Sequence, residues 1–179
     1  ANRDVNPAVL DILARLPKGI DPMAALRTAL SVLGNFDAEA EDMSPEANYR
    51  KSVRLTAQFP TVLAAYDRIR KGLEPIAPRK TGSIAQEFLY MLTGEVPGQA
   101  TEHTFDTCLV LHADHGSNAS TFTGRAAAST LSDMHSSVVS AMGALKGPLH
   151  GGANIAVMKM LKSIDERGIS VEEFVADKF

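Results

Sequence analysis

The stretch DPMAALRTALSVLG, residues 21–34, shows how this chain organises its backbone. An aspartate stands directly before a proline, a pairing typical of a helix N-cap followed by the first helical position. Apolar residues then recur every three or four positions, which predicts an amphipathic helix. They are Met23, Leu26, Leu30 and Leu33. Because Gly34 offers a C-terminal stop, we expect a helix over residues 22–33 with one buried face.

The same signals recur along the rest of the chain. Asn6-Pro7 and Ser44-Pro45 are further cap pairs, and Ser83 with Gln86 and Ser170 with Glu173 have the spacing of capping boxes. Further candidate helix stops are Gly19, Gly72 and Gly94. Helices are expected at about 7–16, 22–33, 45–70, 83–93, 101–114, 119–129, 133–145, 152–166 and 171–177, with a kink or split of the third at Pro60. No stretch shows the sustained alternation of a strand, so the predicted class is all-α.

Composition indicates one soluble globular unit. The chain has 179 residues, of which 45% are hydrophobic and 22% charged, an ordinary balance for a single domain. A net charge of −3 argues against a general binder of nucleic acid or anionic membranes. The sequence has neither a signal-peptide pattern at its start nor a run of about 18–20 apolar residues, so no membrane span is expected. The lone cysteine, Cys108, excludes an internal disulfide and favours a reducing, cytoplasmic compartment; its apolar neighbours predict a buried thiol.

Two short segments place reactive side chains among glycines and small residues. They are LHADHGSNAST, residues 111–121, and LKGPLHGGAN, residues 145–154. In the second, Pro148 ends one helix and Gly151-Gly152 lets the backbone turn into the next. His150 is therefore expected at a helix N-terminus, where the positive end of the helix dipole disfavours protonation. A neutral imidazole there can donate a hydrogen bond to a carbonyl oxygen that gains negative charge. The alternative is a histidine in a loop whose ring only forms hydrogen bonds with nearby backbone groups.

In the first segment, His112 and His115 are three residues apart near the expected end of a helix. The negative end of the dipole favours imidazolium at such a position, which suits a dianionic substrate better than a metal ion. A zinc site would need a third ligand, and neither the spacing of the remaining histidines nor an HExxH motif provides one, so no metal is expected. Asn118 could bind a substrate carboxylate or ketone, or it could cap the following helix. No dinucleotide, P-loop or GxSxG motif is present.

HADHGSNASTFTGR, followed some thirty residues later by LKGPLHGGAN, resembles the citrate synthase family in its bacterial citrate and 2-methylcitrate forms. The helix containing Phe88-Leu89-Tyr90-Met91-Leu92 and the helix containing Phe59-Pro60-Thr61 match as well, so the resemblance covers essentially all 179 residues. It implies a segment of the large helical domain of that fold. It also implies a homodimer that condenses acetyl-CoA with oxaloacetate, with the coenzyme A thioester as a substrate and no permanently bound cofactor.

The resemblance also assigns roles to individual residues. His150 matches the histidine that polarises the thioester. His115, and with it Asn118, matches the oxaloacetate-binding group, and His115 is expected to be catalytic as well. His112 is a further substrate-binding candidate because of its place beside His115 at the end of the expected helix. The backbone segment that contacts coenzyme A matches Leu145, Lys146, Gly147, Pro148 and Leu149.

The family pattern continues beyond what this sequence contains. The second catalytic histidine and the catalytic aspartate of the family follow the GPLHGG segment at a distance, whereas His150 is the last histidine here. The resemblance therefore implies that residues 1–179 form one helical segment, that the small domain and C-terminal catalytic residues are largely absent, and that this segment alone is inactive.

Two alternatives remain open at this point. The first keeps the chemistry but uses propionyl-CoA, as a 2-methylcitrate synthase does, because one methylene changes binding by only about 1–3 kcal/mol. The second is a non-catalytic helical module that serves dimerisation or another interaction. The apolar pattern of residues 133–145, with small residues alongside it, further suggests that this helix lies in a subunit interface.

Overall fold

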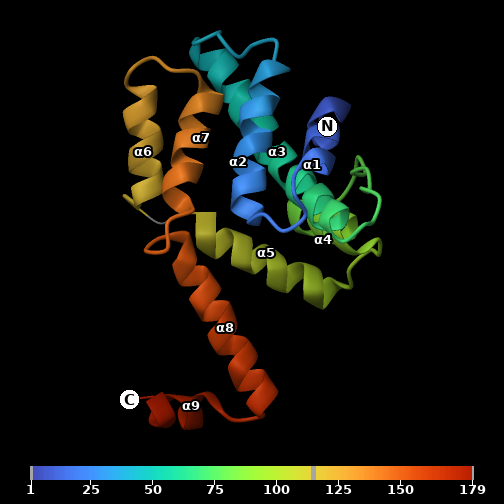
Figure 1. The fold of residues 1–179 in the computed structure, drawn as a ribbon, viewed down its shortest axis with the longest axis vertical. Coiled ribbons are helices and arrows are strands. Elements are labelled where there is room, and N and C mark those ends of the chain that lie inside the picture. The colour runs from blue at the N-terminus through green and yellow to red at the C-terminus, as the bar shows by residue number, and fades with distance from the viewer. Residues whose placement is uncertain (1, 114–115, 179) are drawn as a thin grey trace.

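The computed structural model describes residues 2–113 and 116–178, and all regular structure within those ranges is helical (Figure 1). The helices are α1 (Pro7–Arg15), α2 (Pro22–Asn35), α3 (Pro45–Arg70), α4 (Ile84–Thr93), α5 (Gln99–Ala113), α6 (Ala119–Ala128), α7 (Met134–Leu145), α8 (Gly151–Arg167) and α9 (Val171–Lys178). Each expected helix is present with ends within two residues of the prediction. The all-α class is confirmed.

Local capping explains why these helices begin where they do. The side chains of Asn6, Asp21 and Ser44 accept hydrogen bonds from backbone N–H groups of the first helical turn, at 3.0, 2.9 and 3.3 Å. Ser170 and Glu173 form the full reciprocal capping box, at 2.8 and 3.1 Å. These contacts join residues two or three positions apart, so the local sequence is enough to specify them.

Helix ends match the prediction less uniformly. Gly94 directly follows α4 and Gly72 follows Lys71, the C-cap of α3; the two glycines adopt positive φ values of 90° and 76°, as a glycine stop requires. The prediction that helices stop at Gly34 and Gly19 was wrong. α2 runs through Gly34 to Asn35, and α1 ends at Arg15 because Leu16 precedes a proline and is extended. α3 is not split at Pro60, so any effect of that proline is limited to a kink.

The hydrophobic core lies among α1, α2, α3 and α7. Its fully buried side chains include Val9, Leu13, Leu30 and Val62, and Tyr66 anchors α3 by donating from its hydroxyl to the carbonyl oxygen of Ile20 at 3.0 Å. α7 packs between α2 and α6, as Figure 1 shows. The core thus fixes the helix whose C-terminal end leads into His150.

The apolar stripe of α7 is used inside the chain. Met142 is buried in the core, and Met134, Val138, Val139 and Leu145 pack against that core. The core therefore covers part of the surface of these side chains, and the subunit interface suggested for residues 133–145 remains a prediction. The small residues of α7 do allow close packing, but against α6, where a Cβ on Gly124 would lie 3.3 Å from that of Ala141.

Helices α5, α6, α8 and α9 contain no buried residue among those described, and α8 extends away from the other helices (Figure 1). Cys108 lies on α5 and is exposed, so the prediction of a buried thiol was wrong. Its apolar neighbours Leu109, Val110 and Leu111 are exposed as well. None of the described helices is both long and apolar enough to cross a membrane.

Candidate active site

The segment that carries His150 is a tight connection between two helices. α7 ends at Leu145, and the backbone N–H of His150 donates to the carbonyl oxygen of Gly147 at 3.0 Å. His150 then occupies the N-cap position of α8 without making a side-chain cap bond. The imidazole therefore stands at a helix start, as the sequence predicted, and is free to interact elsewhere.

Gly151 makes this connection possible. A Cβ at this position would collide with the carbonyl oxygen of Leu145, the last residue of α7. The neighbouring Gly152 is less constrained, because its Cβ would lie 3.6 Å from that of Pro148, an ordinary contact. The sequence predicted that these glycines let the backbone turn, and at Gly151 the structure shows why a side chain does not fit: the chain approaches itself closely.

The two polar segments meet through a hydrogen bond between His150 and Ser120. Nε2 of His150 lies 2.9 Å from Oγ of Ser120. The Ser120 hydroxyl in turn donates to Oδ1 of Asn118 at 2.7 Å. Three side chains from two motifs thus form one chain of hydrogen bonds between the starts of α6 and α8.

Asn118 caps α6, which is one of the two roles that the sequence left open for it. Its Oδ1 accepts from the backbone N–H of Thr121 at 2.7 Å as well as from Ser120. The side-chain carbonyl of Asn118 is therefore engaged in local structure, and its cap positions Ser120 for His150.

This network determines where hydrogen atoms can lie. Ser120 has one hydroxyl hydrogen and Oδ1 of Asn118 can only accept, so that hydrogen points to Asn118 and Nε2 of His150 must donate to Ser120. A neutral imidazole in this state presents an acceptor at Nδ1. To donate from Nδ1 while neutral, His150 needs the Ser120 hydroxyl to turn from Asn118 toward Nε2. The orientation of one serine hydroxyl is thus coupled to the tautomer of His150.

His112 lies in the last turn of α5 and is exposed. Its Nδ1 lies 2.7 Å from the carbonyl oxygen of Cys108, which can only accept, so Nδ1 carries a hydrogen and Nε2 remains for another partner. His115, the predicted oxaloacetate ligand, lies outside the described residues, as does Asp114. The expected pairing of His112 with His115 therefore remains a prediction.

The predicted coenzyme A segment is largely on the surface. Lys146, Pro148 and Leu149 are exposed, and Leu149 is fully so, whereas Leu145 packs against the core. Across residues 2–113 and 116–178, no group of three or more His, Cys, Asp or Glu side chains gathers as a metal site would require.

Ser120 is the site residue that the sequence did not single out. It lies within the segment 111–121, but a serine near a helix start is most simply explained by helix capping. Its role depends on a contact with a residue thirty positions away, which no local pattern signals.

Comparison with known proteins gives a consistent result over the whole chain. The family model described as "Citrate synthase, C-terminal domain" matches residues 1–179. Citrate synthase 2 of Bacillus subtilis (strain 168) is 58% identical over 149 residues, covering 83% of this chain and 40% of that protein. The 2-methylcitrate synthase of Mycobacterium tuberculosis (strain ATCC 25618 / H37Rv) is 48% identical over 158 residues, covering 88% of this chain and 40% of that protein.

A solved structure agrees with these sequence relatives. The ternary complex of carboxymethyl coenzyme A and oxaloacetate with citrate synthase from Thermoplasma acidophilum matches with a TM-score of 0.84 and 26% identity. The match covers 91% of this chain and 42% of that one. The chain thus spans less than half the length of the proteins it resembles.

Proposed function

This chain belongs to the citrate synthase family, and from that premise we propose that it supplies part of an enzyme that condenses acetyl-CoA with oxaloacetate to give citrate and coenzyme A. The observation that carries the proposal is the hydrogen-bonded chain from His150 through Ser120 to Asn118. It joins the family's two motifs and places an imidazole at the start of a helix, where a developing enolate oxygen can be stabilised.

The proposed reaction forms one carbon–carbon bond. A carboxylate supplied by the rest of the enzyme removes a methyl proton from acetyl-CoA while His150 donates a hydrogen bond to the thioester oxygen. The resulting enol carbon attacks the ketone carbon of oxaloacetate, and the ketone oxygen takes up a proton as it becomes a hydroxyl. Water then cleaves the citryl thioester and releases coenzyme A. In this scheme the carboxylate acts as the base, and His150 supplies the hydrogen bond to the acetyl oxygen.

The remaining residues serve binding in this proposal. We assign oxaloacetate binding to His115, with Asn118 and His112 beside it, and coenzyme A contacts to Leu145, Lys146, Gly147, Pro148 and Leu149. The exposure of the last four of these, partial for Gly147, supports that assignment. The enzyme is proposed to be a cytoplasmic homodimer with an additional region that supplies the catalytic aspartate and a second histidine.

A coenzyme A release assay tests the activity. The longest polypeptide that contains this chain is supplied with oxaloacetate and acetyl-CoA, and free thiol is followed with time. We expect turnover from the longer protein and none from residues 1–179 alone. Lack of thiol release from the longer protein with any acyl-CoA would contradict the proposal and favour a non-catalytic helical module.

A second acyl donor tests the alternative substrate. One of the relatives is named as a 2-methylcitrate synthase, and it is 48% identical to this chain. In a competition between acetyl-CoA and propionyl-CoA, we expect a higher kcat/KM for acetyl-CoA. The reverse preference would assign the protein to the 2-methylcitrate branch without changing the roles of the residues.

A further inference from the structure

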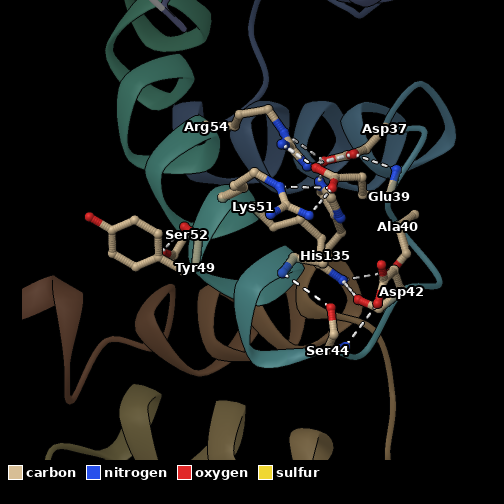
Figure 2. A network of polar contacts seen from close by, with 12 residues as sticks. Asp37, Glu39, Ala40, Asp42, Ser44, Tyr49, Lys51, Ser52, Arg54 and His135 are labelled. Carbon is tan, nitrogen blue, oxygen red and sulfur yellow. Dashed lines mark hydrogen bonds and ion pairs between the residues drawn. The ribbon is translucent and has the colours of Figure 1, made fainter.

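The segment of residues 36–44, here called the acidic loop, is held against α3 by basic side chains (Figure 2). Arg54 binds both carboxylate oxygens of Asp37 at 2.8 Å and Glu39 at 2.7 Å. Arg50 also binds Glu39. The loop is therefore attached to α3 through its carboxylates.

A buried lysine adds a second attachment. The Lys51 side chain is fully buried, and its Nζ donates to the carbonyl oxygens of Ala40 and Asp42 at 3.0 and 2.7 Å. These bonds fix the backbone of the acidic loop. The charge of Lys51 lies beside α7 as well, in the region of His135 (Figure 2).

His135 belongs to the first turn of α7, and its side chain fills the space between the acidic loop and α2. It is 4% exposed, and a Cβ on Gly34 of α2 would lie only 3.0 Å from its own Cβ. Its Nε2 is 3.6 Å from Oδ2 of Asp37, and its Nδ1 is 3.8 Å from Oδ1 of Asp133, both too long for hydrogen bonds. Among the described residues, Nδ1 is a buried atom without a hydrogen-bond partner.

The surroundings disfavour a proton on this imidazole. Burial lowers the pKa of His135; Asp37 and Asp133 act in the opposite direction, and Lys51 and Arg54 lower it further. Burial has this effect because a charged ring would lose the water that solvates it. A neutral imidazole is thus the form that fits this packing.

A protonated ring would need a hydrogen-bond acceptor at each nitrogen, and the two nearest carboxylates already have other partners. Asp37 is already held by Arg54, and Asp133 caps α7 by accepting from the N–H of Ser136 at 2.9 Å. A hollow of about 340 Å³ beside the ring, lined in part by Glu41, offers the imidazole a route toward water. A turn of Asp37 toward the ring weakens its bonds to Arg54 of α3, and a turn of the ring into the hollow removes its packing against Gly34 of α2, so either response loosens the attachment of the acidic loop.

We propose that His135 is an acid-sensitive latch that holds the acidic loop against α2 and α7 while its imidazole is neutral and releases the loop when the ring takes up a proton. The latch rests on the packing of His135 and does not depend on the catalytic proposal. It sits at the start of the helix whose other end leads into His150.

Amide hydrogen exchange in the 179-residue chain tests the latch. The protection factor of peptides from residues 36–43 is compared at pH 7.5 and pH 5.5 after correction for intrinsic exchange. We take the ring to have its ordinary pKa of about 6.5 when the loop is open and to stay neutral when the loop is closed. The equilibrium constant for opening then rises about tenfold as the pH falls from 7.5 to 5.5. Glu39, whose pKa is lowered to about 2 by Arg50 and Arg54, and Asp42 and Asp133, whose pKa values are also lowered, stay ionised throughout.

Two variants separate the latch from general acid sensitivity. His135→Gln should make the protection of the acidic loop equal at the two pH values, whereas His103→Gln, at an exposed position of α5, should keep the tenfold drop. A drop that persists in His135→Gln, or no drop in the unchanged chain, would overturn the proposal.

A direct titration covers the case in which His135→Gln does not fold. The ring resonances of His135 are followed by NMR in the unchanged chain. Titration below the ordinary value, in step with chemical-shift changes in residues 36–43, supports the latch. Titration at the ordinary value with no change in the loop rejects it.

Discussion

Nε2 of His150 lies 2.9 Å from the hydroxyl oxygen of Ser120, although thirty residues separate the two in the chain. Because Ser120 also donates to Asn118, its hydroxyl hydrogen is held away from His150. The serine therefore both orients the ring and takes part in setting its tautomer. This places Ser120 as a positioning residue for the proposed reaction.

Ser120→Ala should lower kcat of the complete enzyme by about ten- to a hundredfold, because a misplaced catalytic group costs up to about that much. KM for oxaloacetate should change little. Ser120→Thr, which keeps the hydroxyl, should recover part of the loss. Ser129→Ala, at the other end of α6 where the hydroxyl bonds to the carbonyl oxygen of Ala126, is the matched control. A Ser120→Ala enzyme with unchanged kcat would remove Ser120 from the mechanism.

His150→Ala should be more severe than Ser120→Ala. Loss of one hydrogen-bond donor to a developing oxyanion typically lowers kcat by about 10²–10³-fold. His103→Ala, which changes an exposed histidine of α5, should leave kcat near that of the unchanged enzyme. Steady-state kinetics of both variants with acetyl-CoA and oxaloacetate make the comparison, and near-normal turnover in His150→Ala would reject its assignment.

Gly151 and Gly152 are adjacent in sequence, but the structure predicts opposite tolerance to substitution. Gly151→Ala places a Cβ against the carbonyl oxygen of Leu145, so the connection between α7 and α8 must shift. Gly152→Ala makes only ordinary contacts, at 3.6 Å from Cβ of Pro148 and 3.8 Å from the carbonyl oxygen of Gly147. In the complete enzyme, we expect Gly151→Ala to lose most activity and Gly152→Ala to retain it. Equal activity in the two variants would show that the connection has more room than the structure gives it.

The sequence could predict the helices because their starting signals are local. Asp21 caps a helix through the N–H of Met23, two residues away, so a short stretch contains both partners. The position of His150 at a helix start follows from the same kind of signal, since Pro148 and Gly151 are its near neighbours. These features depend on backbone chemistry that a window of a few residues specifies.

Three of the features that sequence reasoning missed depend on tertiary packing or on its absence. Gly34 looked like a helix stop, but it lies inside α2, where His135 of α7 packs so closely that there is little room for a side chain. Cys108 has the apolar neighbours of a buried residue, but nothing among the described elements covers it. Ser120 acquires its role only when α8 brings His150 to it. Tertiary packing decides each of these cases.

Two helical glycines allow the packing explanation of Gly34 to be tested. Gly34→Ala would bring a Cβ to 3.0 Å from that of His135, which must move within a buried site, so the free energy of unfolding should fall by about 1–3 kcal/mol. Gly143→Ala, in the exposed part of α7, meets nothing within 4 Å and should raise it by about 0.5–1 kcal/mol. Urea unfolding of both variants measures the difference. Stabilisation of both would show that Gly34 is not a packing requirement.

Glu87 and Arg79 form an ion pair that holds the connection before α4. Glu87 is 1% exposed, and its carboxylate accepts from the backbone N–H of Arg79 at 2.7 Å and from the guanidinium at 2.5 and 2.9 Å. The Arg79 guanidinium also stacks over the Tyr90 ring at 4.3 Å. The carboxylate therefore satisfies a backbone donor and a cation that is partly removed from water.

Glu87→Gln should lower the free energy of unfolding by about 2–3 kcal/mol, because the amide keeps the shape of the carboxylate but not its charge, and part of the Arg79 charge loses its partner. Glu95→Gln, at an exposed position after α4, should stay within about 0.5 kcal/mol of the unchanged chain. For a chain of this length the first change corresponds to a Tm lower by about 4–12 °C. Equal Tm values for the two variants would mean that the pair at Glu87 contributes no more than a surface contact.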